Sequence, residues 1–264
     1  MKRAIISDIH SNLEALEAVL KDIDEQNISE IYCLGDIIGY GANPLECLDI
    51  VRERCAVCIL GNHDQGAIFD PDGFNGMAEK AIFWTREQLE KPSPKRDDRW
   101  DFLNMRPRIY RDSSLSAIFV HGSPRNPLNE YVFPDDVYSP NKLKGVFGLT
   151  QTLAFLGHSH VPGIMVEPLS EDEQYNFFSP DEFGMEKLLT PKKKYLINVG
   201  SVGQPRDMNP KACYVIVEAN GEPEEQEVVV RYRRVQYDIE RAQKKIFEIP
   251  ALENQLAERL SFGR

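Results

Sequence analysis

The stretch Gly61-Asn62-His63-Asp64 places an amide, an imidazole and a carboxylate side by side, directly after an apolar run. This run, residues 56–60, has the length and composition of a buried strand, and the glycine permits a sharp turn where the strand ends. The carboxyl ends of strands are where open α/β sheets bind their ligands. On its own, the motif fits either a functional site or a polar loop with a satisfied histidine.

The same arrangement recurs along the chain, because all five histidines follow short apolar runs that resemble strands. Parallel strands align their carboxyl ends at one edge of a sheet, so we expect the polar side chains there to converge. Two of the histidines are two residues apart and project to the same side of an extended backbone. The residues that follow these runs are Asp8, His10, Asp36, Asn62, His63, His121, His158 and His160.

Imidazole, carboxylate and amide groups together are suitable ligands for Mn, Fe, Zn or Ni. Two ions about 3.5–4 Å apart need a shared ligand, and a carboxylate such as Asp36, which stands alone after its strand, suits that role. Each residue also has an ordinary explanation when taken singly. Asp8 could cap the next helix, Asp36 could be a turn residue, and His121 alone is a weak signal. The complete set, in this order, favours a metal centre.

Strand-like and helical patterns alternate in the first quarter of the chain, which predicts a parallel sheet with right-handed crossovers. Ser11 and Glu14 form a capping-box pattern before a helix that ends near Gln26, and Asn43-Pro44 begins a second helix. The predicted strands are residues 3–7, 31–34, 56–60, 116–120 and 153–156.

The remainder of the chain divides into connections, further strands and terminal helices. A helix is predicted over residues 77–89, an exposed polar connection over 91–98, and an irregular functional loop over 125–143. Four β-like runs beyond residue 161 predict a second, more antiparallel sheet. These runs are residues 163–167, 195–198, 212–218 and 227–237, and helices are predicted at 238–247 and 251–260.

The composition excludes several classes of partner. With 264 residues, 42% of them hydrophobic, the chain is long enough for one large domain with a sizeable core. Asp and Glu outnumber Lys and Arg by 42 to 31, and the net charge of -11 argues against long nucleic acids and anionic membranes. A small phosphorylated substrate stays compatible with this charge, because a metal centre can reverse it locally. No apolar stretch reaches the roughly 18 residues that span a membrane.

The five cysteines and the lack of a signal peptide predict reduced thiols and a cytoplasmic protein. Cys55 and Cys58 are spaced like a redox or zinc motif. Because no second pair accompanies them and Cys58 lies in an apolar run, we favour buried thiols.

Taken together, the motifs resemble those of the calcineurin-like metallophosphoesterase superfamily. They are, in order, Asp8-x-His10, Gly35-Asp36, Gly61-Asn62-His63-Asp64, His121 and Gly157-His158-Ser159-His160. The resemblance implies a two-sheet α/β sandwich that forms a single domain over residues 1–264. Insertions are then expected at about 65–114 and 123–151, and a C-terminal helical segment at about 238–260.

The same resemblance implies two divalent transition-metal ions and a hydrolytic mechanism in which a metal-bridging hydroxide attacks phosphorus. His63 would assist the leaving group, and Asp64 could orient its imidazole. Asn12 and Arg206 are candidate phosphate contacts, although each could equally be a loop residue. By this resemblance, one ion would be held by Asp8, His10, Asp36 and His160, and the other by Asp36, Asn62, His121 and His158.

A finer resemblance, which includes residues 198–206, is to small bacterial and archaeal phosphoesterases, some of them similar to diadenosine tetraphosphatases. The Ser/Thr phosphatase pattern has an arginine after the second motif, where this chain reads Gly39-Tyr40-Gly41. We therefore expect a small phosphodiester or phosphomonoester as substrate, with a dinucleoside polyphosphate as the alternative. A protein phosphatase, a nuclease and a non-catalytic interaction module are less favoured, and the oligomeric state stays open, with a homodimer as one option. Aromatic side chains that could contact a base, or could simply pack their loop, are Tyr131, Phe133, Tyr138 and Phe147.

Overall fold

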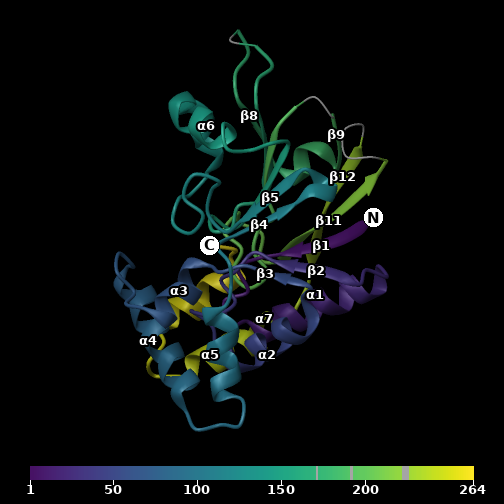
Figure 1. The fold of residues 1–264 in the computed structure, drawn as a ribbon. Coiled ribbons are helices and arrows are strands. Elements are labelled where there is room, and N and C mark those ends of the chain that lie inside the picture. The colour runs from purple at the N-terminus through teal and green to yellow at the C-terminus, as the bar shows by residue number, and fades with distance from the viewer. Residues whose placement is uncertain (171, 191–192, 222–225) are drawn as a thin grey trace.

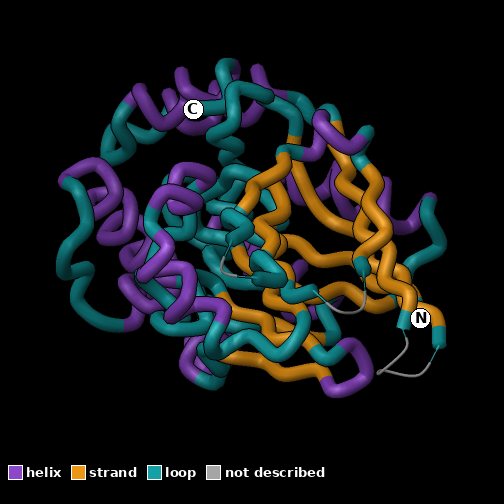
Figure 2. Tube along the Cα trace, turned by 90° about the horizontal axis from the view of Figure 1, so that it is seen from above, coloured by secondary structure: helices purple, strands orange, loops and turns teal. Residues whose placement is uncertain are grey.

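Two six-stranded mixed sheets form the centre of the molecule in a computed structural model that describes residues 1–170, 172–190, 193–221 and 226–264. Helices lie outside the sheets (Figures 1 and 2). This is the two-sheet α/β sandwich that the sequence predicts. The first sheet has the order β3 (Val57–Cys58), β2 (Glu30–Cys33), β1 (Lys2–Ile6), β11 (Ala212–Asn220), β12 (Glu227–Val235) and β9 (Glu186–Leu189). The second has the order β4 (Ile109–Asp112), β5 (Ala117–Val120), β6 (Leu153–Leu156), β10 (Tyr195–Asn198), β7 (Gly163–Val166) and β8 (Asn176–Phe178).

The division of strands between the sheets differs from the prediction. Strands β11 and β12 belong to the first sheet, where β11 pairs antiparallel with β1, and β5 and β6 lie in the second sheet. Both faces of the central strands are covered, so their apolar runs indicate burial and carry no information about which sheet they join. Within the sheets, β1–β3 are parallel, and so are β5, β6 and β10.

Helices cover the outer faces of both sheets and account for two further differences from the prediction. Helix α5 (Arg96–Asn104) occupies part of the expected exposed connection, because Leu103 is buried and Arg99 donates two hydrogen bonds to Asp49 at 2.8 and 3.0 Å. Helix α6 (Pro140–Phe147) lies partly within the expected irregular loop. The helices are α1 (Leu13–Glu25), α2 (Pro44–Arg54), α3 (Asn62–Ile68), α4 (Gly76–Glu90), α5 (Arg96–Asn104), α6 (Pro140–Phe147), α7 (Ile239–Phe247) and α8 (Asn254–Glu258).

The apolar core has one layer between the sheets and a layer on each outer face. Ile5 and Val215 of the first sheet and Phe119 and Phe155 of the second meet in the central layer. Helices α1 and α2 pack on the outer face of the first sheet, and α6 packs on that of the second. The polar loops at the strand ends are therefore anchored to two sheets that are packed on both faces.

The C-terminal helices, drawn in yellow in Figure 1, return to the beginning of the chain. Glu14 is buried on α1 and pairs with Lys245 at 2.5 Å and Arg241 at 3.1 Å on α7. Glu14 therefore does not complete the predicted capping box. Asn12 replaces Ser11 as the cap, because its Oδ1 accepts a hydrogen bond from the Ala15 amide at 3.1 Å.

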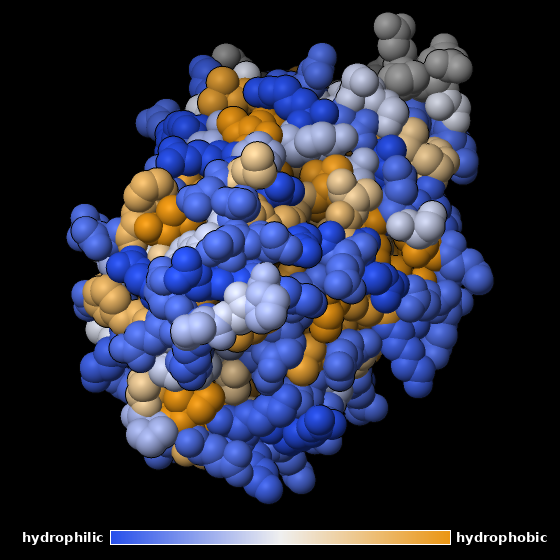
Figure 3. Space-filling model, turned by 60° about the horizontal axis from the view of Figure 1, so that its bottom comes forward, coloured by the Kyte–Doolittle hydropathy of each residue, from blue (hydrophilic) through white to orange (hydrophobic). Residues whose placement is uncertain are grey.

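The face of the molecule shown in Figure 3 is largely hydrophilic, with apolar side chains in separate patches. Within the described part of the chain, no helix has the length and apolar character needed to cross a membrane. All five cysteines are free, and Cys58 is buried as predicted.

Candidate active site

Loops from both sheets meet to form one buried cluster of metal-ligating side chains. Asp8 and His10 follow β1, and Asp36 follows β2. Asn62 and His63 begin α3, just after β3. The second sheet contributes three histidines after β5 and β6. The buried members of the cluster are Asp8, His10, Asp36, His63, His121, His158 and His160, each no more than 4% exposed.

Left-handed backbone conformations aim several of these side chains. Asp8, His10 and Asp36 have φ values of 54°, 49° and 52°, and His158 and His160 have 66° and 60°. Non-glycine residues adopt this region at a cost of about 1–3 kcal/mol each, so the surrounding contacts must hold them there. Among those contacts, the His10 amide donates to the Asp36 carbonyl at 2.9 Å. Strain concentrated in one place is typical of a functional site.

The first ligand group contains Asp8, His10 and His160. Nε2 of His160 lies 3.2 Å from Oδ1 of Asp8 and 3.1 Å from Nε2 of His10. Nε2 of His10 also lies 3.7 Å from Oδ2 of Asp36, which connects this group to the second.

The second ligand group contains Asp36, His121 and His158, with Asn62 beside them. Nε2 of His121 lies 2.9 Å from Oδ1 of Asn62, 3.2 Å from Nδ1 of His158 and 3.3 Å from Oδ2 of Asp36. Asp36 is thus the carboxylate between the two groups, which is the place expected of a shared ligand.

Backbone carbonyls fix the orientation of three imidazoles and show that the cluster fits cations. Nδ1 of His10, His121 and His160 contacts the carbonyl oxygens of Ile38, Leu34 and Gln204 at 3.3, 2.9 and 2.5 Å. A carbonyl only accepts hydrogen bonds, so each Nδ1 carries a proton, and in the neutral ring Nε2 directs a lone pair into the cluster. The two Nε2 atoms that lie 3.1 Å apart then face each other as acceptors. Positive ions between such groups relieve this conflict, and the donor types suit divalent transition metals.

The electrostatics of the cluster also favour positive charge. Burial alone would raise the pKa of Asp36, but His121 and His63 hold it well below its ordinary value. Burial opposes protonation of His121, yet the Asp36 carboxylate raises the pKa of this imidazole to about 9, so at pH 7 a proton competes with a cation for Nε2. The carboxylates therefore remain ionised and attract a cation.

His63 forms a third group of possible ligands with His10 and Asp36, and its ring lies in an aromatic surrounding. Its ring centroid is 4.4 Å from that of Tyr40, 4.8 Å from that of His10 and 5.0 Å from that of Phe74. Its backbone amide donates to Oδ1 of Asp36 at 2.8 Å. Burial lowers the pKa of His63 to about 4. Nδ1 of the ring is buried and has no hydrogen-bond partner among the described residues.

Asp64 does not orient the imidazole of His63, contrary to the prediction. Its Oδ1 accepts hydrogen bonds from the amides of Ile37 and Ile38 at 3.0 and 3.3 Å, and its Oδ2 accepts one from Gly61 at 3.0 Å. Asp64 therefore joins the loop after β2 to the beginning of α3. The sequence alone does not show whether an aspartate that follows a histidine binds the imidazole or nearby backbone amides.

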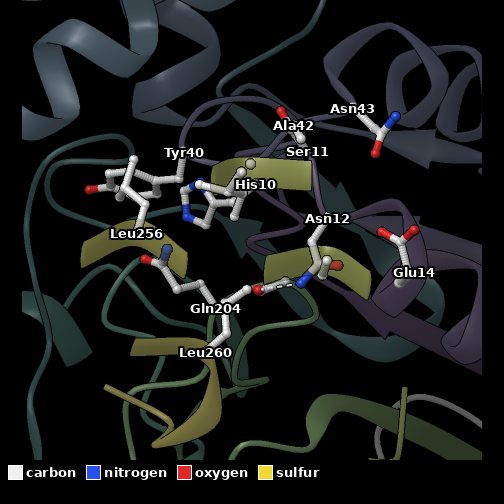
Figure 4. Close-up of a pocket in the computed structure, with 14 residues that line it drawn as sticks. His10, Ser11, Asn12, Glu14, Tyr40, Ala42, Asn43, Gln204, Leu256 and Leu260 are labelled. Carbon is white, nitrogen blue, oxygen red and sulfur yellow. Dashed lines mark hydrogen bonds between the residues drawn. The ribbon is translucent and has the colours of Figure 1, made fainter. Parts of the chain in front are cut away.

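The two candidate phosphate contacts differ. Both polar atoms of the Asn12 side chain contact the backbone, since its Oδ1 caps α1 and its Nδ2 donates to the Gly203 carbonyl at 2.8 Å (Figure 4). Arg206 is half-buried, and its guanidinium lies 5.9 Å from the centroid of the Tyr40 ring. Its charge contributes to the lowered pKa of His63, so it is near enough to influence this imidazole.

A cavity of about 310 Å³ opens onto the cluster at Asn62, His63 and His158. Phe74 and Tyr131 form part of its wall, so both predicted insertions border the site. The Tyr131 ring stacks on His158 at a centroid distance of 3.8 Å, and the Phe133 ring stacks on Tyr131 at 5.1 Å. Tyr138 instead is 84% exposed and Phe147 is buried in the core, so neither reaches this cavity.

Tyr40 and Phe74 are site residues that the sequence reasoning missed. Tyr40 contacts His10 as well as His63, and Figure 4 shows its ring beside that of His10. Its place directly after Gly39 in the second motif was a usable signal.

Comparison with known proteins agrees with this geometry. The family model for the calcineurin-like phosphoesterase superfamily domain matches residues 1–222. The chain belongs to this superfamily. It is 40% identical over 270 residues to the uncharacterised protein MJ0912 of Methanocaldococcus jannaschii, covering 99% of this chain and 98% of that one.

Two further similarities differ in extent. The crystal structure of a metallophosphoesterase from Sphaerobacter thermophilus superposes with a TM-score of 0.77 and 35% identity, over 100% of this chain and 99% of the other. A symmetrical bis(5'-nucleosyl)-tetraphosphatase of Glaesserella parasuis is 26% identical over 129 residues, which cover 46% of this chain and 44% of that enzyme. The superfamily and the fold are thus established over nearly the whole chain.

Proposed function

We propose that this phosphoesterase hydrolyses a small phosphodiester or phosphomonoester with two divalent transition-metal ions. The observation that carries the proposal is the position of Asp36 between two buried ligand groups. When bound, two such ions activate water and neutralise phosphoryl oxygens. By their orientation, His10, His121 and His160 would hold them through Nε2, His158 through Nδ1, and Asp8, Asp36 and Asn62 through oxygen.

His63 is the best-placed group to act on the leaving oxygen. It borders both the ligand groups and the cavity, and its low pKa keeps it neutral at pH 7 in the free protein. A neutral imidazole donates one N–H, and a bound phosphate raises the proton affinity of a nearby imidazole. Gly39 permits this placement, because a Cβ there would lie 2.4 Å from Nδ1 of His63.

The size and walls of the cavity support a small substrate over a phosphoprotein. Tyr131 and Phe133 form an aromatic stack beside it, which suits a nucleotide base. The net charge of -11 disfavours long nucleic acids and anionic membranes as partners, and the five free cysteines are consistent with a reducing compartment such as the cytoplasm.

Metal analysis and a substrate panel test the proposal together. The Mn²⁺-loaded protein should contain two ions per chain and hydrolyse bis(p-nitrophenyl) phosphate, and chelation should abolish turnover. The panel should add p-nitrophenyl phosphate, cyclic nucleotides and a phosphopeptide. At most one ion in the fully loaded protein, or preferred turnover of the phosphopeptide, would contradict the proposal.

A dinucleoside polyphosphate is the second candidate substrate. The partial similarity to the symmetrical bis(5'-nucleosyl)-tetraphosphatase favours it, although that similarity covers under half of either chain. Diadenosine tetraphosphate therefore belongs in the panel, and a best kcat/KM on this compound would select the second candidate.

A further inference from the structure

Two arginines from distant parts of the chain lie against the same aromatic ring at the edge of the active site. The guanidinium carbons of Arg206 and Arg259 are 5.9 and 4.6 Å from the centroid of the Tyr40 ring. That ring is 4.4 Å from the ring of His63. Arg259 follows α8 in the C-terminal segment, beyond residues 1–222 that match the superfamily.

Neither arginine has an acidic partner within the described ranges, in a chain with more acidic than basic residues. Nε and Nη2 of Arg259 are buried without a hydrogen-bond partner, and the side chain of Arg206 donates to the neutral Gln204 at 3.1 Å. By contrast, the buried Arg99 pairs with Asp49 and the half-buried Arg234 pairs with Asp207, whereas Arg86 and Arg106 donate to backbone carbonyls.

Two guanidinium groups that lie against one ring without an acidic partner among the described residues are costly, because burial removes water and like charges repel. In agreement, burial and the charge of Arg206 lower the pKa of Arg259 to about 10. Such a pair is stabilised when an anion lies between or beside its members. Guanidinium groups hydrogen-bond phosphate in a two-pronged geometry, which makes phosphate the best match.

We propose that Arg206 and Arg259, which both lie against the Tyr40 ring, form a subsite for a phosphate group of the substrate other than the one that is hydrolysed. This inference rests on the proposed function, because it places the reacting phosphate at the metal-ligand cluster. It narrows the substrate class to compounds with at least two phosphate groups, such as nucleoside or dinucleoside polyphosphates.

The surroundings of Tyr40 limit what the subsite can hold. Behind the ring lies a crevice lined by Gln204, Leu256 and Leu260 (Figure 4). Its accessible volume is about 10 Å³, which is enough for a single water molecule. A base or sugar does not fit there. Tyr40 also forms part of the wall of the cavity of about 310 Å³, so both arginines lie against a ring that borders the substrate space.

Binding of a bisphosphonate tests the subsite without turnover. Methylenebisphosphonate and methylphosphonate should be titrated calorimetrically into the full-length protein, with saturating Mn²⁺ in both solutions. We expect the wild-type protein to bind the bisphosphonate at least tenfold more tightly, and Arg259→Met or Arg206→Met to lose most of that preference. Methionine keeps an apolar chain against Tyr40 and removes the charge. Arg264→Met, an exposed arginine of the same terminal segment, is the matched control and should keep the preference.

Kinetics give a second readout. In Arg259→Met, KM for diadenosine tetraphosphate should rise at least tenfold, and by a larger factor than KM for bis(p-nitrophenyl) phosphate, which has a single phosphate. Arg259→Lys keeps the charge and should show a smaller loss, and it replaces the methionine variant if that variant fails to fold. Equal effects on both substrates, or an unchanged bisphosphonate preference in folded Arg259→Met and Arg259→Lys, would overturn the subsite. If the Mn²⁺-loaded wild-type protein turned over no ester, the proposed function would fail, and the calorimetric preference would still decide the subsite.

Discussion

The ligand cluster and the rim of the cavity are built in different ways, although they belong to one site. In the cluster, Asp8, His10 and Asp36 are no more than 1% exposed, and backbone carbonyls orient three of the imidazoles. On the rim, Tyr131 is 40% exposed and is held mainly by stacking. A buried group with fixed partners has one geometry, whereas a half-exposed aromatic ring can adjust to a ligand.

This difference suggests a division of labour. The cluster comes from short motifs at the ends of strands, and the two packed sheets hold it in place. The rim comes from the insertions, which supply Phe74 and Tyr131, and the C-terminal segment adds Arg259 against the Tyr40 ring of the cavity wall. We infer that the cluster determines the reaction and the rim determines the substrate. Substitutions in the two regions should therefore change different quantities.

The largest effect is expected from Asp36→Asn in the cluster. Both ligand groups lose the carboxylate between them, so both ions should bind more weakly and turnover should fall by more than the 10–100-fold typical of a lost outer-shell partner. Metal content after gel filtration and kcat on bis(p-nitrophenyl) phosphate measure this. A variant that retained two tightly bound ions would show that Asp36 is not shared.

His63→Ala should lower kcat by about 10²–10⁴-fold while leaving two ions bound, because we assign His63 to the leaving group. Its ring also lies close to His10 and Asp36, so metal content is the deciding measurement. An ester with a leaving group of low pKa needs less protonation and should restore part of the rate. Loss of the ions in this variant would make His63 a ligand.

The cluster could be predicted from sequence because each of its members follows a strand. An apolar run followed by Asp, His or Asn is visible locally, and parallel pairing brings such ends together. What could not be predicted was the role of groups whose partners are backbone atoms. The Asp64 carboxylate accepts hydrogen bonds from the amides of Ile37, Ile38 and Gly61. No sequence pattern distinguishes this role from a hydrogen bond to the His63 imidazole.

The rim and the sheet order were harder to predict for a different physical reason. Arg259 meets Tyr40 across more than two hundred residues, and such contacts leave no periodic trace in the sequence. Strand β11 is buried on both faces and β12 buries one face, and neither pattern shows which sheet the strand joins. Helix α5 is mostly polar and is held by contacts such as Arg99 with Asp49.

Gly61→Ala should weaken metal binding through a purely steric effect. A Cβ at this position would lie 2.1 Å from both the backbone nitrogen and Oδ1 of Asp36, so the carboxylate must move. We expect a loss of about 10–100-fold in metal affinity, as for a lost outer-shell partner, measured by competition with a chelator. Gly76→Ala is the matched control, because nothing lies within 4 Å of a Cβ there. Equal metal affinity in both variants would show that the loops adapt more easily than their packing suggests.

The smallest effect is expected from Asn12→Ala, which tests whether the Asn12 side chain caps a helix or contacts phosphate. The variant loses the cap of α1 and the hydrogen bond to Gly203, so unfolding should require about 0.5–2 kcal/mol less free energy. KM for every substrate in the panel should stay the same, because the side chain is directed at the backbone. Asn12→Ser keeps a capping oxygen and should recover part of the stability. Denaturant unfolding and steady-state kinetics on the same preparations decide the matter. A raised KM with unchanged stability would show that Asn12 contacts the substrate, as Arg206 and Arg259 are proposed to do.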